Sequence, residues 1–303
     1  MFDIPIAFFI YNRAQHTKRV FEAIRTIGPR RLIVVADGPK NVADTAGCNC
    51  ARRVTEYVDW DCDVRRLYSD VNLGCKQRVS TGLACVFDLH DQAIILEDDC
   101  VPEPTFFQFA SELLERFRDD ERVTCISGDC HVPVSAPFSY AFTRFTFIWG
   151  WATWRRAWMN YDIKMKAWPH LRNTDWLESA LKSRTAAAIL RQTFDRVASG
   201  AVDTWDTQWL FSSLLQGGYG IIPTRNLITN IGWGQGATHT KQDGCRLANM
   251  VRRPIVFPLS HPVNIAVDEV LERKLFEAVW GSTSSSALRV WAASRWHRIR
   301  SLY

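Results

Sequence analysis

The sequence lacks several features that would place it in a common protein class. It has no CxxC pair, and its nine cysteines include only the spacings Cys48-x-Cys50 and Cys125 to Cys130, which do not suit the usual zinc sites. The apolar run from Ile4 to Ile10 is too short for a transmembrane helix and has no basic start like that of a signal peptide. The net charge of +5 is mild, which argues against a general nucleic-acid binder.

What remains is the composition of an ordinary soluble enzyme. The 303 residues are 23% charged and 47% hydrophobic, enough for one large domain or two modest ones, and no internal repeat is present. We expect most cysteines to be reduced, buried and inert, which predicts a cytoplasmic protein. The thirteen tryptophans are many, and they suit either sugar stacking or core packing.

The first half alternates apolar strands with amphipathic helices. Strands are expected at residues 4–10, 32–36, 64–68 and 93–96, with helices between them and another from Pro104 to Phe117. The strands are rich in valine and isoleucine and show no polar alternation, which is typical of a parallel sheet covered on both faces. The sequence therefore predicts an α/β fold with a mostly parallel central sheet flanked by helices.

Polar clusters stand directly after each of these four strands. They are Tyr11-Asn12-Arg13, Asp37-Gly38, Asp70 with Asn72-Leu73-Gly74, and Glu97-Asp98-Asp99. Each cluster alone suits a turn or a helix cap, but the carboxyl ends of parallel strands share one edge, where open sheets bind ligands. We therefore expect the four clusters to converge on one site.

The triplet Glu97-Asp98-Asp99 is the most demanding of these clusters. Three adjacent carboxylates repel one another, so they are costly to bury unless a cation or hydrogen-bond donors lie nearby. A divalent metal carrying a nucleotide diphosphate would relieve the repulsion, and a solvated acidic turn is the alternative. Lys76 lies early on the helix after the third strand, where it would reach phosphates or remain a surface charge.

The second half is less regular and rich in tryptophan. In chain order it carries an aromatic stretch at 149–154, a helical region at 174–199, the segment 203–209, a short strand at 219–222 and a glycine-rich segment from Gly232. Residues 282–303 read as a serine-rich linker followed by a basic amphipathic helix. That helix would lie on an anionic membrane surface, or dock on the protein, or fray.

These motifs together resemble the glycosyltransferases of the GT-A fold, over most of the chain. The polar clusters and Leu96-Glu97-Asp98-Asp99 are similar to family 2 and to the N-acetylglucosaminyltransferase I type. Trp149-Gly150-Trp151, Trp205-Asp206-Thr207-Gln208-Trp209 and the segment through His239 follow in the order of the latter. This chain departs from it in the Thr207-Gln208 pair, where the eukaryotic enzymes have the shorter Trp-Asp-Asp-Trp, and in lacking an N-terminal anchor.

The resemblance implies a donor site with Asp99 as the ligand of Mn²⁺ or Mg²⁺. It places Asp98 on the ribose, Glu97 on the donor sugar, Arg13 near the base or diphosphate and Asp37 on the base, the alternatives being a surface charge for Arg13 and a helix cap for Asp37. The predicted donor-binding residues are Arg13, Asp37, Asn72, Lys76, Glu97, Asp98 and Thr238. The glycine-rich segment would form a lid in which His239 binds phosphate or completes the metal shell, unless it is structural.

Asp206 is the expected general base, with Asp203 as the rival and a helix cap as the alternative role. Trp205 and Trp209 would shield Asp206 from water and raise its pKa, and Trp151 joins them on the acceptor side.

The resulting hypothesis is a metal-dependent inverting glycosyltransferase that moves a sugar, from UDP in our expectation, to a glycan or lipid-linked acceptor of surface polysaccharide synthesis. Residues 1–130 would bind the donor, 131–281 would form a smaller mixed acceptor-side region, and 282–303 would contact the inner face of the plasma membrane. The alternatives are a nucleotidyltransferase, whose glycine-rich phosphate loop is missing around Tyr11-Asn12-Arg13, and a non-catalytic glycan- or membrane-binding module.

Overall fold

The computed structural model describes residues 2–233 and 247–280, and it shows an α/β fold built on one mixed sheet. In the order β3-β2-β1-β4-β8-β6-β9-β7, the eight strands are β3 (Asp63–Tyr68), β2 (Arg31–Ala36), β1 (Ile6–Ile10), β4 (Gln92–Glu97), β8 (Trp151–Trp154), β6 (Val123–Ser127), β9 (Tyr219–Pro223) and β7 (Tyr140–Thr143). The strands β3 to β4 are mutually parallel, as the sequence predicts.

Helices cover both faces of the sheet. Successive strand residues point to opposite faces, and both sets are apolar, so each face packs against helices. Phe8 and its even-numbered neighbours pack on α1 (Ala14–Ile27), α2 (Val42–Val54) and α4 (Thr105–Arg116). Phe9 and the alternate residues pack on α3 (Gly74–Leu89), α5 (Arg155–Trp158) and α9 (Asp206–Leu215). The sheet is therefore the middle one of three layers, with helices on both sides.

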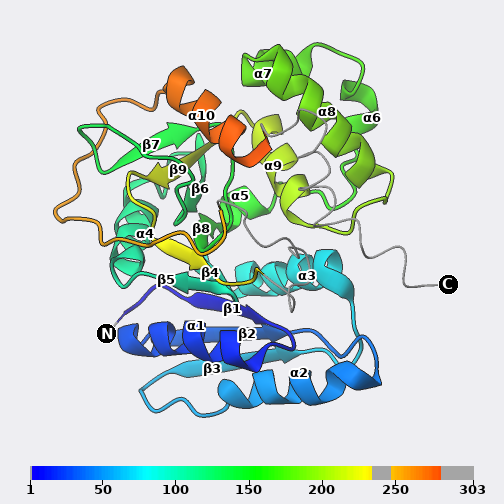
Figure 1. The fold of residues 1–303 in the computed structure, drawn as a ribbon, viewed down its shortest axis with the longest axis vertical. Helices are drawn as coiled ribbons and strands as arrows, with labels where there is room; N and C mark the ends of the chain where they lie inside the picture. Colours follow the sequence, from blue (N-terminus) through cyan, green and yellow to red (C-terminus); the bar gives the residue numbers. More distant parts are fainter. Residues whose placement is uncertain (1, 234–246, 281–303) are drawn as a thin grey trace.

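A second, smaller core lies on the outer side of α9. It joins α6 (Trp168–Leu171), α7 (Trp176–Leu181), α8 (Arg184–Ala198) and α10 (Glu269–Trp280). The helical region expected at 174–199 is two helices, because Lys182 takes a left-handed conformation (φ 51°) between them. Figure 1 shows α6, α7 and α8 gathered at the end of the molecule away from α1 and α2.

The antiparallel strand β8 is the main element that the sequence did not indicate. It lies between β4 and β6 and runs antiparallel to both, so β6 again runs parallel to β4. The chain enters β8 through Gly150, whose φ of 59° favours glycine. Because β6 and β4 run in the same direction, the residues after β6 lie on the same sheet edge as the acidic triplet.

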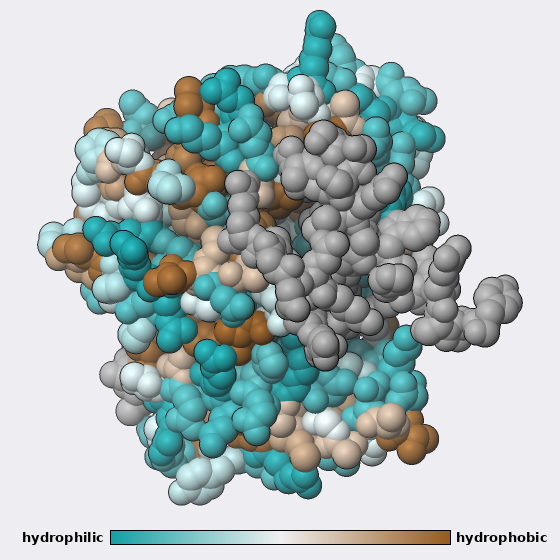
Figure 2. Space-filling model, in the orientation of Figure 1, coloured by the Kyte–Doolittle hydropathy of each residue, from teal (hydrophilic) through white to brown (hydrophobic). Residues whose placement is uncertain are grey.

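The visible surface is mostly hydrophilic, with hydrophobic residues scattered among polar ones (Figure 2). Within the described ranges, no helix is long and apolar enough to cross a membrane. The eight described cysteines are all free, but only four are buried and Cys85 is exposed, so fewer are buried than expected. The serine linker and basic C-terminal helix expected at 282–303 lie outside the described residues.

Helix α10 is fastened by a buried ion pair. Glu272 accepts hydrogen bonds from the backbone N–H of Arg144 at 2.6 Å and from the Thr143 hydroxyl at 3.2 Å, and it pairs with the Arg144 guanidinium. Glu272 and Arg144 are 5% and 7% exposed, whereas the second partner of Arg144, Glu269, is half exposed. The buried carboxylate is therefore the main anchor of the helix.

We expect Glu272→Ala to lower the free energy of unfolding by about 3 kcal/mol, because it leaves a buried guanidinium without its best-shielded partner. The matched control Glu269→Ala removes an exposed partner of the same arginine and should cost under about 1 kcal/mol. Urea denaturation followed by circular dichroism measures both. Equal losses for the two variants would contradict the assignment of the anchor to Glu272.

Candidate functional site

The acidic triplet lies at the carboxyl end of β4, where a single arginine neutralises two of its members. One terminal nitrogen of Arg13, which follows β1, lies 2.7 Å from Oδ1 of Asp98 and 2.7 Å from Oδ2 of Asp99. The backbone N–H of Tyr11 donates to the other oxygen of Asp98 at 3.2 Å. The cation and donors that the triplet was expected to need are thus supplied, in this structure, by the loop after β1.

The environment of Arg13 keeps it charged. Burial alone would lower the pKa of its guanidinium, but the carboxylates of Asp98 and Asp99 raise that pKa above its ordinary value. Burial also raises the pKa of Asp98, and Arg13 acts in the opposite direction. The two carboxylates therefore share one guanidinium, which offsets part of their mutual repulsion.

Glu97 stands apart from the other two acids. Its Oε1 atom is buried and has no hydrogen-bond partner in the described part of the chain. Burial, followed by the charges of Asp99, Asp98 and Asp206, raises the pKa of Glu97 to about 8. Burial and the neighbouring carboxylates therefore favour the protonated form of Glu97, in which the carboxyl group can donate a hydrogen bond.

The antiparallel pairing of β5 (Cys100–Pro102) with β10 (Ile228–Asn230) brings a distant segment onto Asp99. The pairing continues past β10, because the N–H of Ile231 donates to the carbonyl of Asp99 at 2.8 Å. Gly232 then lies so close that an added Cβ would be 2.1 Å from Oδ2 of Asp99. Only glycine fits at position 232 without moving the carboxylate, so the segment expected to act as a lid begins directly at the triplet.

Asp37 and Asn72 join the ends of β2 and β3. Asp37 is 6% exposed and accepts from the N–H groups of Gly38, Leu73 and Gly74 and from the side-chain amide of Asn72, at 2.9 to 3.1 Å. These four donors use the whole acceptor capacity of the carboxylate. Asp37 therefore caps α3, and the alternative role of a helix cap describes it better than direct contact with a base.

Two further basic side chains lie on the first turns of α3. Lys76 is half-buried, and the guanidinium of Arg78 donates to the carbonyl of Leu67, so Arg78 holds the helix against β3.

In the loop after β1, the Tyr11 hydroxyl and the Asn12 amide both donate to Asp44 of α2, at 3.0 and 2.9 Å. The loop that carries Arg13 is thereby fixed against α2.

Asp206 is the first residue of α9. Its negative charge is one of the smaller contributions that raise the pKa of Glu97 in the triplet. Its Oδ1 accepts from the N–H of Thr207 at 2.6 Å and from the hydroxyl of Thr204. The side chain therefore also caps its own helix, the alternative raised from the sequence. The rival Asp203 is exposed, and its Oδ2 would lie 3.1 Å from a Cβ at Gly74.

The three tryptophans expected on the acceptor side lie inside the core. Trp151, Trp205 and Trp209 are 0%, 2% and 0% exposed, and Trp151 is stacked on Trp205 with ring centroids 5.5 Å apart. Their burial fits the expected shielding role of Trp205 and Trp209 and leaves little ring surface for contact with an acceptor. They pack with Trp158, and this cluster holds the first turn of α9, where Asp206 lies.

A polar pair after β6 was missed from the sequence. Nε2 of His131 lies 2.8 Å from Oδ2 of Asp129, and the two side chains are 4% and 1% exposed. The imidazole packs on Phe147 and Trp149, and Trp149 packs in turn on Trp233. The signal was available, because Asp129 follows the apolar run 123–126 as the other clusters follow their strands.

The carboxylates suit a hard divalent cation in chemistry, since Mg²⁺ and Mn²⁺ favour oxygen ligands. Within residues 2–233 and 247–280, however, no three His, Cys, Asp or Glu side chains are grouped so as to hold a metal ion. Arg13 lies against one oxygen of Asp99, and the Cys100 thiol lies 3.5 Å from the other. A metal at Asp99 would need its other ligands from phosphate, water or residues outside these ranges, where the predicted Thr238 and His239 lie.

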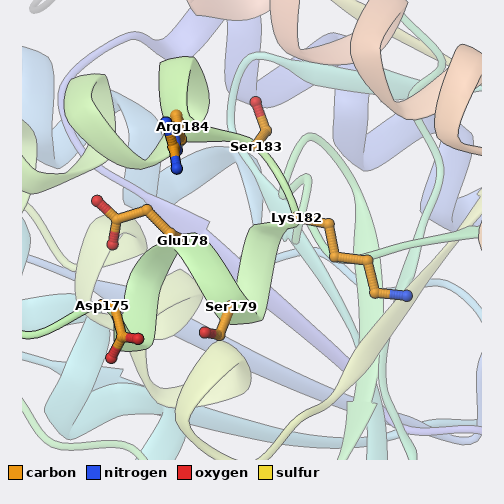
Figure 3. A pocket seen from close by; sticks show the side chains of 6 residues that line it. All are labelled: Asp175, Glu178, Ser179, Lys182, Ser183 and Arg184. Carbon is orange, nitrogen blue, oxygen red and sulfur yellow. The ribbon is translucent and has the colours of Figure 1, made fainter.

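A hollow of about 540 Å³ lies elsewhere, at the junction of α7 and α8. Figure 3 shows its lining, in which acidic and basic side chains alternate with serines: Asp175, Glu178, Ser179, Lys182, Ser183 and Arg184. Glu178 is paired with Arg191 at 2.9 Å. None of the predicted site residues lines this hollow, so it is separate from the carboxyl edge of the sheet.

No protein-family model matches the chain, and no curated protein is significantly similar to it in sequence. Solved structures with a similar fold include mouse xyloside xylosyltransferase 1, with 11% identity over 70% of this chain and 81% of that one and a TM-score of 0.33. HddC from Yersinia pseudotuberculosis has 12% identity over 47% and 59%, with a TM-score of 0.28. A UDP-glucose pyrophosphorylase in complex with UDP-glucose has 9% identity over 41% and 56%, with a TM-score of 0.26.

The chain spans somewhat more than half the length of HddC and of the pyrophosphorylase. At these identities and TM-scores the likeness is confined to the general α/β arrangement, and it assigns no residue.

The raised pKa of Glu97 predicts how stability depends on pH. Glu97 titrates near 4.5 when unfolded and near 8 in the fold, so between these values the folded protein holds a proton that the unfolded chain has released. The contribution of Glu97 to the free energy of unfolding therefore falls as pH rises from 4.5 to about 8, by at most roughly 1.4 kcal/mol per pH unit.

Glu97→Gln removes this loss, so the variant should gain stability relative to the native protein across that pH range and keep the gain above it. Urea denaturation at several pH values measures the difference. Parallel stability curves for the two proteins would contradict a raised pKa at Glu97.

Proposed function

We propose that the protein is an inverting, metal-dependent glycosyltransferase that moves a sugar from UDP to a glycan or lipid-linked acceptor. One observation carries the proposal: the acidic triplet lies at the carboxyl edge of the parallel strands with Arg13 against Asp98 and Asp99, and Asp206 begins a separate helix that packs on the same sheet. An inverting transfer needs a carboxylate base apart from the groups that bind the leaving diphosphate, and Asp206 and Arg13 are proposed for these two tasks.

Residues of the triplet and its loop would hold the donor. Asp98 is proposed to contact the ribose, and Glu97, as a protonated carboxyl, to donate to a hydroxyl of the donor sugar. Arg13, with Lys76 on α3, would pair with the diphosphate, since guanidinium groups suit phosphate oxygens. Asn72 is proposed to contact the donor near its nucleobase, and Asp37 fixes the loop that carries Asn72.

The transfer step assigns the proton to Asp206. The acceptor hydroxyl oxygen forms a bond to the anomeric carbon while the bond from that carbon to the diphosphate oxygen breaks. The electron pair leaves with the nucleoside diphosphate, and Asp206 takes the hydroxyl proton. A metal ion held by Asp99, with His239 as a further ligand, would offset the charge that grows on the diphosphate.

A nucleotidyltransferase is the second candidate, because such enzymes are also built on an α/β sheet of this general kind, and one fold hosts several activities. The residues 11–13 lack the glycine-rich phosphate loop that such an enzyme would use. Incubation with UDP-sugars and Mn²⁺ separates the candidates. A glycosyltransferase releases UDP slowly, a nucleotidyltransferase acts with NTP and pyrophosphate, and a binding module releases nothing.

Asp206→Asn should abolish transfer while leaving donor binding unchanged. The amide keeps the shape and the hydrogen bond from Thr207 but does not accept the proton, so we expect the rate to fall by about 10²-fold or more. UDP release and calorimetric donor binding measure the two quantities. Asp203→Asn is the matched control three residues away and should retain activity; retained activity in Asp206→Asn would show that the base lies elsewhere.

The contact of Arg13 with Asp98 and Asp99 predicts competition with divalent metal. Arg13→Gln removes a positive charge from between two carboxylates, so it should bind Mn²⁺ about tenfold more tightly in the absence of nucleotide. It should also have a lower melting temperature, which Mn²⁺ partly restores. Calorimetric titration measures the affinity, with Arg19→Gln on the exposed side of α1 as the control. An unchanged Mn²⁺ affinity in Arg13→Gln would mean that the metal does not bind at these acids.

A further inference from the structure

Tyr161 connects the helix beside the donor loops to the helix that begins with Asp206. Its hydroxyl donates to the backbone carbonyl of Trp205 at 3.2 Å and lies 3.1 Å from the hydroxyl of Ser80 on α3. A hydroxyl carries one hydrogen: that of Tyr161 goes to the Trp205 carbonyl, and that of Ser80 goes to the carbonyl of Lys76 at 2.6 Å. The Tyr161 hydroxyl therefore lies between α3, where it contacts the Ser80 oxygen, and the residue that precedes Asp206, to which it is hydrogen-bonded.

The ring of Tyr161 is held as firmly as its hydroxyl. It is stacked on Trp158, with centroids 4.3 Å apart and an interplanar angle of 9°. The next residue, Asp162, donates its N–H to the hydroxyl of Ser212 on α9 at 3.2 Å. Burial, with a smaller effect from Asp206, raises the pKa of Tyr161, so the hydroxyl stays protonated and remains a donor.

The Trp205 carbonyl does not need Tyr161 in order to be satisfied. It already accepts the N–H of Trp209 at 3.2 Å within α9. The bond from Tyr161 is therefore an additional constraint on the first turn of this helix. That turn also fixes the Asp206 carboxylate, through the hydroxyl of Thr204 and the N–H of Thr207.

We propose that Tyr161 is a positioning residue that sets the distance of Asp206 from the donor side of the site. The inference rests on the proposed function, in which Asp206 takes the proton of the acceptor. Tyr161 itself touches neither substrate; it acts through the backbone of Trp205, and Ser80 ties it to α3. Because a misplacement of about 1 Å costs up to about 10²-fold in rate, a loosened first turn should show in kcat rather than in donor binding.

Tyr161→Phe keeps the stacked ring and removes only the hydroxyl, so the variant should fold with nearly the native melting temperature. We expect kcat for transfer to fall by about tenfold, with the donor KM within about twofold of the native value. Amide hydrogen exchange of residues 203–209 should become faster, and exchange elsewhere should not change. The control is Tyr140→Phe. The hydroxyl of Tyr140, on β7, lies 3.2 Å from Nδ1 of His261, and its removal should leave kcat, the donor KM and the exchange of residues 203–209 unchanged.

Ser80→Ala supplies an independent variant of the same connection. It should change kcat and exchange in the same direction, and the double variant should be no slower than Tyr161→Phe alone within about twofold, since both act through one chain of contacts. Native kcat and native exchange in Tyr161→Phe would overturn the proposal, as would a loss confined to KM. Exchange also separates the two hypotheses: faster exchange at 203–209 in a protein that transfers no sugar supports the positioning role and contradicts the proposed function.

Discussion

The structure of the site depends on one arginine between two carboxylates. Three adjacent acids at the end of a buried strand would repel one another strongly, and removing them from water adds to that cost. Arg13 reaches them from the loop after β1, a strand that pairs directly with β4 in parallel register. The pairing of these two strands therefore decides where the cation stands, and the rest of the edge is arranged around it.

The loops at this edge are fixed largely by the polar groups of the chain itself. Asp37 joins the ends of β2 and β3, Asp44 holds the loop that carries Arg13, and the antiparallel pairing of β5 with β10 places Gly232 against Asp99. Asp206 lies at the start of α9, next to the cluster of buried tryptophans Trp151, Trp205 and Trp209. In the proposed reaction a donor would thus meet a site whose charges are already arranged. Arg13 would move from the carboxylates to phosphate, leaving Asp98 for the ribose and Asp99 for the metal ion.

Much of this fold was predictable, because its signals are local. Continuous apolar runs indicated β1, β2 and β4, whereas the edge strand β3 contains Arg65 and Arg66 and has no such run. The polar residues after each strand indicated the edge at which they converge. The position of β8 was not predictable, because an antiparallel strand inserted between β4 and β6 depends on contacts made about sixty residues apart. For the same reason the sequence did not show that Trp151, the first residue of β8, packs with Trp205 and Trp209 in one buried cluster.

Roles of individual residues were harder to predict than their position in the chain. Asp37 follows a strand like the acids of the triplet, yet four N–H donors use its oxygens, and no local pattern shows this. Asp129 and His131 obey the strand-end rule but follow a strand outside the first alternating series. Tyr161 belongs to no motif, and its proposed role comes from contacts with Ser80 and Trp205, which lie 81 and 44 positions away in the sequence.

The central claim, that the acidic triplet is the centre of a donor site, is tested most directly by thermal stabilisation. A panel of nucleotide sugars with Mn²⁺ is added to the native protein and to Asp99→Asn, and the melting temperature is followed. Binding to the folded state at 100 times Kd contributes about 2.7 kcal/mol, so the account predicts a rise of several degrees with at least one donor, and a much smaller rise in the variant. No stabilisation of the native protein by any donor, or equal stabilisation of both proteins, would contradict it.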